Sequence, residues 1–448
     1  MAEERLRLSS RPPDMHPPKR PAPITADEFD QAMTAFAPFE CTPHLAVAVS
    51  GGADSMALVV LAHDWVRQRG GRIDALIVDH GLRAASANEA ALTAERLKAL
   101  GVDAHILQWQ GPKPVNGIQA AARRTRYALL DGWCRTNGVL HLAVAHHADD
   151  QAETFMMRVR RGSGPDGLAA MAPLRTLAAC RLLRPLLDFP KSRLCATLQA
   201  RGVGWVEDPS NSDPKYARTA IRRELADSID AAAGVLIATR RFARARHALE
   251  TETARWLAAH ATLDRTGYMV CDTRALAGTS AEIRLRVLSR AAQCIGGKAY
   301  APEIAAVERL DAKLLAGQGA TLGGAHFDPR PGGIGVFREA RNLPAPTVLG
   351  PGAHHWDGRY VIALAGEMAG EMAGATVLPW TAEVADAWPK SARPVWFRSL
   401  PAKVRPGVPL IRIGAGYLAP RPGSIENNGI SVHFAPTMPL SGGGFTVA

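Results

Sequence analysis

The sequence predicts an α/β protein: a doubly wound parallel sheet, followed by a small helical domain and a β-rich C-terminal module. Two observations predict the sheet. Up to about residue 145, short β-branched apolar runs alternate with longer stretches rich in Ala and Leu, as strands and helices do in a parallel sheet. Each longer stretch also has enough residues to cross back over one face of the sheet.

The individual elements follow from the same pattern. The expected strands are the apolar runs Leu45–Val49, Ile73–Val78, Ala104–Trp109 and Leu140–Ala145. The expected helices between them are Ser55–Arg69, Ser86–Leu100 and Gly117–Thr136. Two further helices are expected at Ala231–Ala259 and Ser280–Gln293. Beyond about residue 312, Gly and Pro become frequent among short apolar runs such as Tyr360–Leu364, which indicates strands and turns.

A chain of 448 residues is about three times the commonest domain size of roughly 150, so several domains are expected. The predicted segments are a disordered, Pro-rich leader (1–24), the α/β domain (25–230), a helical domain (231–311) and an α+β or β-rich module (312–448). Inside the last, the tandem repeat Gly366–Ala373 is interpreted as a loop duplication.

The composition restricts the class of partner and the compartment. Lys and Arg number 53 against 42 Asp and Glu, and the net charge of +11 suits a polyanionic partner such as nucleic acid. A merely solubilising basic surface is the commoner reason for such a charge, so the motifs must decide between the two. The sequence has no run of about 18 apolar residues and no signal peptide, so we expect a cytoplasmic protein without a membrane partner. The six cysteines are too scattered for a zinc ribbon or a redox dithiol.

The strongest chemical signal is Ser50-Gly51-Gly52-Ala53-Asp54-Ser55, between the first expected strand and its helix. Glycines let backbone N–H groups approach oxygen atoms closely, and a helix N-terminus favours an anion, so this loop predicts phosphate binding. It is not a Walker A sequence, because it lacks the lysine of that motif. Asp54 would repel a bare phosphate, which indicates that it holds a Mg²⁺ ion bridging the phosphates of the ligand.

Polar motifs follow other strands. Val78–Arg83 contains His80 and is where an adenine would lie, because ligands gather at the carboxyl ends of parallel strands. In the third expected helix, Arg126 lies three residues after Arg123, and an arginine in the cleft could neutralise charge on the α-phosphate.

The stretch after the fourth strand, Ala145–Thr154, concentrates carboxylates at the start of another helix. Asp150 and Glu153 lie three residues apart, so both could face an incoming ammonium group, orient it and help to deprotonate it. The HExxH spacing is absent and no cysteine lies nearby, so a zinc site is not expected.

Together with Arg161–Leu168, Glu207–Asp213 and Tyr216–Arg222, these motifs resemble the tRNA(Ile)-lysidine synthetase family over roughly residues 45 to 225. The resemblance implies an N-type ATP-pyrophosphatase fold of Rossmann-like topology, and ATP, Mg²⁺, L-lysine and tRNA(Ile) with a CAU anticodon as ligands. It implies that the C2 oxygen of the wobble cytidine attacks the α-phosphorus of ATP and that lysine then displaces AMP to give lysidine.

Carried over to this sequence, the resemblance implies that Ser50–Ser55 bind pyrophosphate, Asp54 binds magnesium, and Asp150 and Glu153 recognise lysine. Arg126 and Arg218 match arginines near the nucleotide. The alternatives are a tRNA thiolase of the same superfamily, which needs sulfur-carrying or cluster-binding cysteines, a small-molecule amidating ligase, and an inactive tRNA-binding module. The sequence leaves open whether the protein is a homodimer.

A dense basic patch follows the α/β domain, made of Arg240, Arg241, Arg244 and Arg246. It is interpreted either as a contact to tRNA phosphates or as a solvated helix face.

Overall fold

The structure, a computed structural model, describes residues 21–82, 86–206, 220–221, 224–225, 229–350, 352–364, 374–424 and 429–441. The predicted leader up to residue 20, the repeat Gly366–Ala373 and Arg218 lie outside these residues. The chain folds as two compact units, the first running to Ala243 and the second beginning at Arg244.

The first unit contains a six-stranded sheet and its helices. Its strands are β1 (His44–Val49), β2 (Arg72–Asp79), β3 (Asp103–Gln108), β4 (His141–Ala143), β5 (Leu174–Thr176) and β6 (Arg181–Leu183). Its helices are α1 (Ala26–Thr34), α2 (Ala53–Arg67), α3 (Ser86–Ala99), α4 (Ile118–Thr136), α5 (Ala148–Arg160), α6 (Pro165–Leu168) and α7 (Lys191–Ala200). Helix α9 (Ile229–His260) continues from this unit into the second.

The strand order, β3-β2-β1-β4-β6-β5, confirms the predicted doubly wound fold. All neighbouring strands are parallel except β5, which pairs antiparallel with β6, so the sheet is mixed at one edge. The chain proceeds outward from β1 to β3 and then crosses to β4 on the other side of β1. The order therefore reverses between β1 and β4, which is where ligands bind in open α/β sheets.

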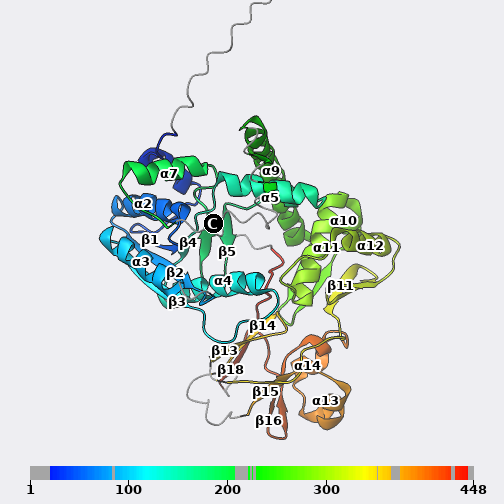
Figure 1. Cartoon of the computed structure of the whole chain (residues 1–448). Helices are drawn as coiled ribbons and strands as arrows, with labels where there is room; N and C mark the ends of the chain where they lie inside the picture. Colours follow the sequence, from blue (N-terminus) through cyan, green and yellow to red (C-terminus); the bar gives the residue numbers. More distant parts are fainter. Residues whose placement is uncertain are drawn as a thin grey trace, which may run out of the picture. The chain divides into compact units, whose positions relative to one another are not determined.

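Alternating side chains of the strands bury both faces of this sheet, as parallel strands require. Leu45 and Val47 point into a core shared with α2, whereas Ala46 and Ala48 point into a second core that contains Leu130 of α4. Figure 1 shows α2 and α4 on opposite sides of the sheet. The crossover helices therefore hold the sheet between two apolar layers.

A polar cluster joins the amino ends of three strands. The buried carboxylate of Asp74 in β2 contacts His44 Nε2 of β1 at 2.6 Å and His105 Nε2 of β3 at 2.8 Å. Burial alone would raise the pKa of Asp74, but Arg72 and these two imidazoles outweigh it and hold that pKa below its ordinary value. The cluster ties together β1, β2 and β3 at the edge of the sheet opposite to their carboxyl ends.

The second unit contains three antiparallel sheets. Its helices, besides the end of α9, are α10 (Thr273–Gly278), α11 (Ala281–Gly296), α12 (Ile304–Leu315), α13 (Ala382–Ala387) and α14 (Val395–Ser399), with short 3₁₀ turns at Lys390–Ala392 and Arg405–Gly407. One sheet has the order β7-β8-β11-β10-β9, with β7 (Ala261–Asp264), β8 (Tyr268–Cys271), β9 (Ala320–Leu322), β10 (Ala325–Arg330) and β11 (Gly333–Arg338). The others are β12-β15-β16-β17 (Thr347–Val348, Thr376–Leu378, Leu410–Ile413, Gly416–Leu418) and β13-β14-β18 (Gly352–Trp356, Tyr360–Leu364, Ile430–Phe434).

The stretch 231–311, expected to form a helical domain, also contains the hairpin β7–β8. Its turn is closed by the Gly267 N–H, which donates to Asp264 O at 2.9 Å, with Gly267 at a φ of +77°. Met269 and Cys271 are buried on one face of β8 and pack with Val287 of α11. Because β8 pairs with β11, one sheet contains strands from both sides of the expected boundary at residue 311. Helices α10 to α12 pack against this sheet and not only against one another.

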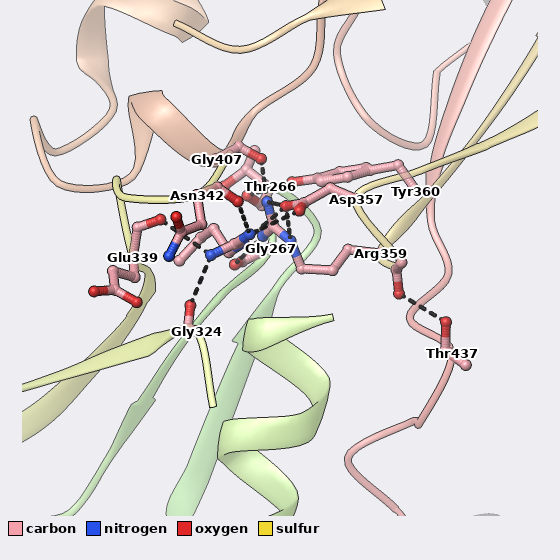
Figure 2. Close-up of polar contacts among 12 residues, drawn as sticks. Thr266, Gly267, Gly324, Glu339, Asn342, Asp357, Arg359, Tyr360, Gly407 and Thr437 are labelled. Atoms are coloured by element: carbon pink, nitrogen blue, oxygen red, sulfur yellow. Dashed lines mark hydrogen bonds and ion pairs between the residues drawn. The ribbon is translucent and has the colours of Figure 1, made fainter. Parts of the chain in front are cut away.

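An arginine clamp, consisting of Arg338, Asp357 and Arg359, connects the three sheets of the second unit (Figure 2). Arg338, at the end of β11, makes a bidentate pair with Asp357, both N–O distances being 2.9 Å. Arg359 Nε donates to Asp357 Oδ2 at 2.8 Å, and its other nitrogens donate to the carbonyl oxygens of Gly267 and Gly407. All three side chains of the clamp are at most 5% exposed, so the two guanidinium groups depend on a single buried carboxylate.

No helix among the described ranges is both long and apolar enough to cross a bilayer.

The clamp generates a stability prediction. Asp357→Ala should lower the free energy of unfolding of the second unit by about 3–5 kcal/mol, because it leaves two buried guanidinium groups without a counter-charge. Urea unfolding followed by intrinsic fluorescence would measure it. Asp328→Ala is the matched control: Asp328 also contacts two cations, Arg330 and Lys403, but these side chains are 44% and 48% exposed, so about 1 kcal/mol or less is expected. Equal losses in the two variants would contradict the assigned importance of the clamp.

Candidate active site

The loop Ser50–Ser55, which we call the PP-loop, joins the carboxyl end of β1 to the first turn of α2. Helix α2 begins at Ala53, and its first intrahelical bond runs from the Met56 N–H to Gly52 O at 3.0 Å. The Ser50 N–H donates to Ser55 Oγ at 3.2 Å, and that hydroxyl donates to Gly52 O at 3.0 Å. The serines thus hold the loop in place, while the N–H groups of the first helical turn are left for an anion.

Gly51 could not be replaced by a larger residue without a change in this loop. Its φ is +82°, a conformation that L residues rarely adopt, and an added Cβ would lie 2.5 Å from Thr93 Oγ1 of α3. Gly51 O also accepts a hydrogen bond from the Val206 N–H at 2.9 Å. Packing from two sides therefore fixes the turn that precedes α2.

Asp54 lies in the first turn of α2 and faces His147 and Lys191. Its Oδ2 is 3.6 Å from His147 Nε2 and 3.6 Å from Lys191 Nζ. Burial alone would raise the pKa of Asp54, but His147 and Lys191 outweigh it and keep that pKa below its ordinary value. The other oxygen, Oδ1, is buried and has no hydrogen-bond partner among the described atoms. Asp54 is therefore ionised and has one oxygen ready for a ligand.

The second part of the site is the N-terminus of α5, which follows β4 across the switch in strand order. His147 caps this helix, and its N–H donates to Asp150 Oδ2 at 3.1 Å. The His147 ring is also 3.6 Å from Asp150 Oδ2 and 3.7 Å from Asp149 Oδ2. Burial lowers the pKa of His147, but Asp54, Asp150 and Asp149 outweigh it and raise that pKa above its ordinary value. His147 thus links the PP-loop to the carboxylates of α5.

The third part combines imidazoles at the ends of β2 and β4 with arginines. Burial and then Arg126 lower the pKa of His80. Burial, Arg184 and Arg126 lower the pKa of His146 to about 3, so its ring is neutral at neutral pH. Both rings have a buried Nδ1 without a hydrogen-bond partner in the described part of the chain. Arg126, half-buried in α4, has its own pKa lowered by burial.

The structure thus brings several predicted residues together. The PP-loop, with Asp54, meets Asp150 through His147, and His80 and Arg126 are close enough to influence each other electrostatically. Glu153 lies one turn further along α5 and is 2% exposed. The structure does not describe Arg218.

Sequence reasoning missed three side chains. His147 and His146 lie in the stretch Ala145–Thr154, in which only Asp150 and Glu153 were predicted to have a role. Lys191 was not noticed at all, because the strand before it, β6, has only three residues and was not predicted. The available signal was its position, since a residue that follows a parallel strand and starts a helix lies at the same edge as the PP-loop.

The residues fit a magnesium ion only in a limited way. The part of the chain that the structure describes has no group of three or more His, Cys, Asp or Glu side chains arranged to hold a metal ion. Magnesium in nucleotide sites is commonly held by one or two carboxylates together with the phosphates of the substrate. The unpartnered Oδ1 of Asp54 is compatible with that arrangement.

Comparison with known proteins decides the family. A family model described as a PP-loop domain matches residues 24–229. The chain is 42% identical over 322 residues to a tRNA(Ile)-lysidine synthase from Bradyrhizobium sp., which is 67% of this chain and 87% of that relative. It is 35% identical over 375 residues to one from Rhizobium meliloti, which is 80% of this chain and 82% of that relative. The chain belongs to the tRNA(Ile)-lysidine synthase family.

Membership of the tRNA(Ile)-lysidine synthase family confirms the resemblance inferred from the motifs and supports it over the thiolase and the inactive module. Among solved structures, the chain is similar to a U34-tRNA thiolase from Methanococcus maripaludis. That similarity has a TM-score of 0.41 at 15% identity and covers 49% of this chain and 78% of the other.

The packing around Gly51 generates a prediction for the site. Gly51→Ala should weaken ATP binding by about tenfold or more, because the left-handed φ costs an L residue about 1–2 kcal/mol and the new methyl group overlaps Thr93. Isothermal titration of ATP would measure it. Gly70→Ala is the control, since Gly70 has a φ of +63° in the turn after α2 and an added Cβ would have only a 3.9 Å contact. Unchanged ATP affinity in Gly51→Ala would mean that the loop tolerates the displacement.

Proposed function

We propose that this protein is a tRNA(Ile)-lysidine synthetase, which joins L-lysine to C2 of the wobble cytidine of tRNA(Ile) with a CAU anticodon and converts ATP to AMP and pyrophosphate. The observation that carries the proposal is the meeting of the PP-loop with the carboxylates of α5 through His147. The PP-loop suits the phosphates of ATP, and the carboxylates of α5 suit an amine. We assign this ligase chemistry to residues 25–230 and place it in the cytoplasm, with ATP and tRNA.

In the first step, the C2 oxygen of cytidine attacks the α-phosphorus of ATP. A bond forms between that oxygen and phosphorus, the bond to the β-phosphate oxygen breaks, and pyrophosphate leaves. The PP-loop holds the departing pyrophosphate, with donors from Ser50, Gly51, Gly52, Ala53 and Ser55, and the adenine lies near His80. Arg126 stabilises the charge on the α-phosphate. From the family resemblance we give Arg218 a related role.

Asp54 is the proposed ligand of a magnesium ion. When bound, that ion would offset the negative charge of the phosphates. The lowered pKa of Asp54 keeps its carboxylate ionised at neutral pH, as a metal ligand must be. Its Oδ2 already faces His147 and Lys191, which leaves Oδ1 as the oxygen directed to a ligand.

In the second step, the side-chain amine of lysine attacks C2 of the adenylated cytidine and AMP departs with the former C2 oxygen. The amine has an ordinary pKa near 10.4 and must lose a proton before it can attack. Asp150 and Glu153 are proposed to orient the ammonium group and to accept that proton. His147 holds Asp150 at the start of α5, so this carboxylate has a fixed position relative to the PP-loop.

An assay of both half-reactions tests the proposal. Purified protein, ATP, Mg²⁺, labelled lysine and tRNA(Ile) with a CAU anticodon should give labelled tRNA, and Asp54→Ala should abolish both this product and AMP release. Asp150→Asn should lower lysine incorporation by at least about a hundredfold while tRNA-dependent pyrophosphate release persists, because only the second step needs an acceptor for the amine proton.

The matched control is Asp64→Asn, which alters an exposed carboxylate at the other end of α2, paired with Arg201, and should leave both products unchanged. AMP release without lysine incorporation would point to another adenylating enzyme, such as a tRNA thiolase. AMP release that is indifferent to tRNA would indicate a small-molecule ligase. Binding of tRNA with neither product would indicate the inactive module.

We also propose that α9 contacts tRNA phosphates. Arg241 and Arg244 are exposed and lie three residues apart on one face, whereas Arg240 already pairs with Asp188 at 2.8 Å. Replacing Arg241 and Arg244 with Ala should weaken tRNA binding and reduce the slope of log affinity against log salt by about 2. Filter binding at several salt concentrations would measure both quantities.

The control for this pair is Arg255→Ala, which removes an exposed arginine of the same helix that pairs with Glu252. It should have little effect on tRNA affinity. An unchanged salt dependence after loss of Arg241 and Arg244 would sink the idea of phosphate contacts on this face.

A further inference from the structure

The PP-loop lacks a cation of its own. Its six residues include no lysine or arginine, and Asp54 adds a negative charge. Bound ATP brings about four more negative charges, and pyrophosphate leaves with a similar number. A magnesium ion at Asp54 would offset only about two of them, so cationic groups from elsewhere in the fold are expected to face the loop.

Among the residues that the structure describes, Lys191 brings an ammonium group to the loop. Its Nζ lies 3.6 Å from Asp54 Oδ2, and its side chain is 43% exposed. The Lys191 N–H donates to Asp149 Oδ2 at 3.2 Å, and Phe189 O accepts from the Ala148 N–H at 3.0 Å. These two hydrogen bonds hold the start of α7 against the start of α5. The backbone of Lys191 is therefore fixed, while its ammonium group can change position.

The contribution of the ion pair to stability does not explain why Lys191 lies beside Asp54. A lysine–carboxylate pair with both side chains 30–43% exposed contributes little to stability, because water screens the attraction. A lysine has three donors on a flexible stem and is a common phosphate ligand, acting as a point charge. From its position beside Asp54, the ammonium group can turn toward any anion that the PP-loop holds.

A second observation supports an anion at this place. The N-termini of α2, α5 and α7 converge, because Asp54 in the first turn of α2 contacts both His147, the cap of α5, and Lys191, the first residue of α7. Each helix N-terminus carries a partial positive charge of about half an elementary unit. The three helix ends offset part of the negative charge of Asp54, Asp149 and Asp150, and the ammonium group of Lys191 adds a full positive charge beside the PP-loop.

We propose that Lys191 binds the β- and γ-phosphates of ATP and then the pyrophosphate product, supplying from α7 the cation that the PP-loop lacks. The inference rests on the proposed function, since it concerns the pyrophosphate released in the first step. Lys191 donates to phosphate oxygens and stabilises the leaving group as the bond to the α-phosphorus breaks. It makes no contact with the AMP part of the nucleotide.

Titration calorimetry with magnesium pyrophosphate and, separately, with AMP tests this assignment on the full chain without tRNA or lysine. Lys191→Met, which keeps the length of the side chain, should weaken pyrophosphate binding by about tenfold or more and leave AMP binding within twofold. Lys191→Arg should recover most of the pyrophosphate affinity. Arg201→Ala removes a cation at the other end of α7, where it pairs with Asp64, and should change neither affinity.

The comparison of the two ligands separates a phosphate contact from a structural role. Equal losses for pyrophosphate and AMP in Lys191→Met would overturn the proposal, because they would mean that the site had been distorted. Unchanged pyrophosphate affinity, or no measurable pyrophosphate binding by the wild-type protein, would also overturn it. Because no tRNA or lysine is present, a selective loss of pyrophosphate binding supports the role of Lys191 even if lysidine is not the product.

Discussion

The parallel pairing of β1 with β4 and of β4 with β6 brings three distant segments of the chain to one edge of the sheet. Because parallel strands all end at the same edge, the helices that follow them begin there too. Asp54, His147 and Lys191 follow three different strands, and Asp54 Oδ2 is nevertheless 3.6 Å from His147 Nε2 and 3.6 Å from Lys191 Nζ. The site depends on this direction of the strands more than on any single motif.

The shared direction of the strands also brings several carboxylates close together, and His147 reduces the repulsion between them. Asp54, Asp149 and Asp150 are gathered at helix N-termini, where carboxylates are favoured, but they also repel one another. His147, only 3% exposed, lies among them and has a raised pKa in spite of its burial. His146, the neighbouring residue, faces arginines and has a strongly lowered pKa. Two adjacent histidines thus mark the border between an acidic and a basic part of the site.

The sequence predicted the elements whose signal is local. The expected strands at residues 45–49, 73–78 and 104–109 differ from β1, β2 and β3 by one residue at each end or less, because their apolar β-branched runs are bounded by turns. Strand β6 was missed because three residues give no periodicity, and Lys191 was missed with it. The hairpin β7–β8 was missed because its strands have only four residues each, and β8 is stabilised by pairing with β11, far along the chain. Contacts such as that of Asp54 with His147 depend on strand order, which no local pattern encodes.

The arginine clamp has a consequence for the order in which the protein is made. Arg338 emerges from the ribosome before Asp357, and the Gly407 carbonyl that receives Arg359 emerges later still. The last described segment closes on the same turn, where the Ala435 and Thr437 N–H groups donate to Arg359 O and Gly358 O. Domains generally fold as units and N-terminal ones first during synthesis, so the first unit can form on the ribosome. The second unit cannot complete the clamp until residue 407 has been synthesised, so it becomes native later during synthesis than the first unit.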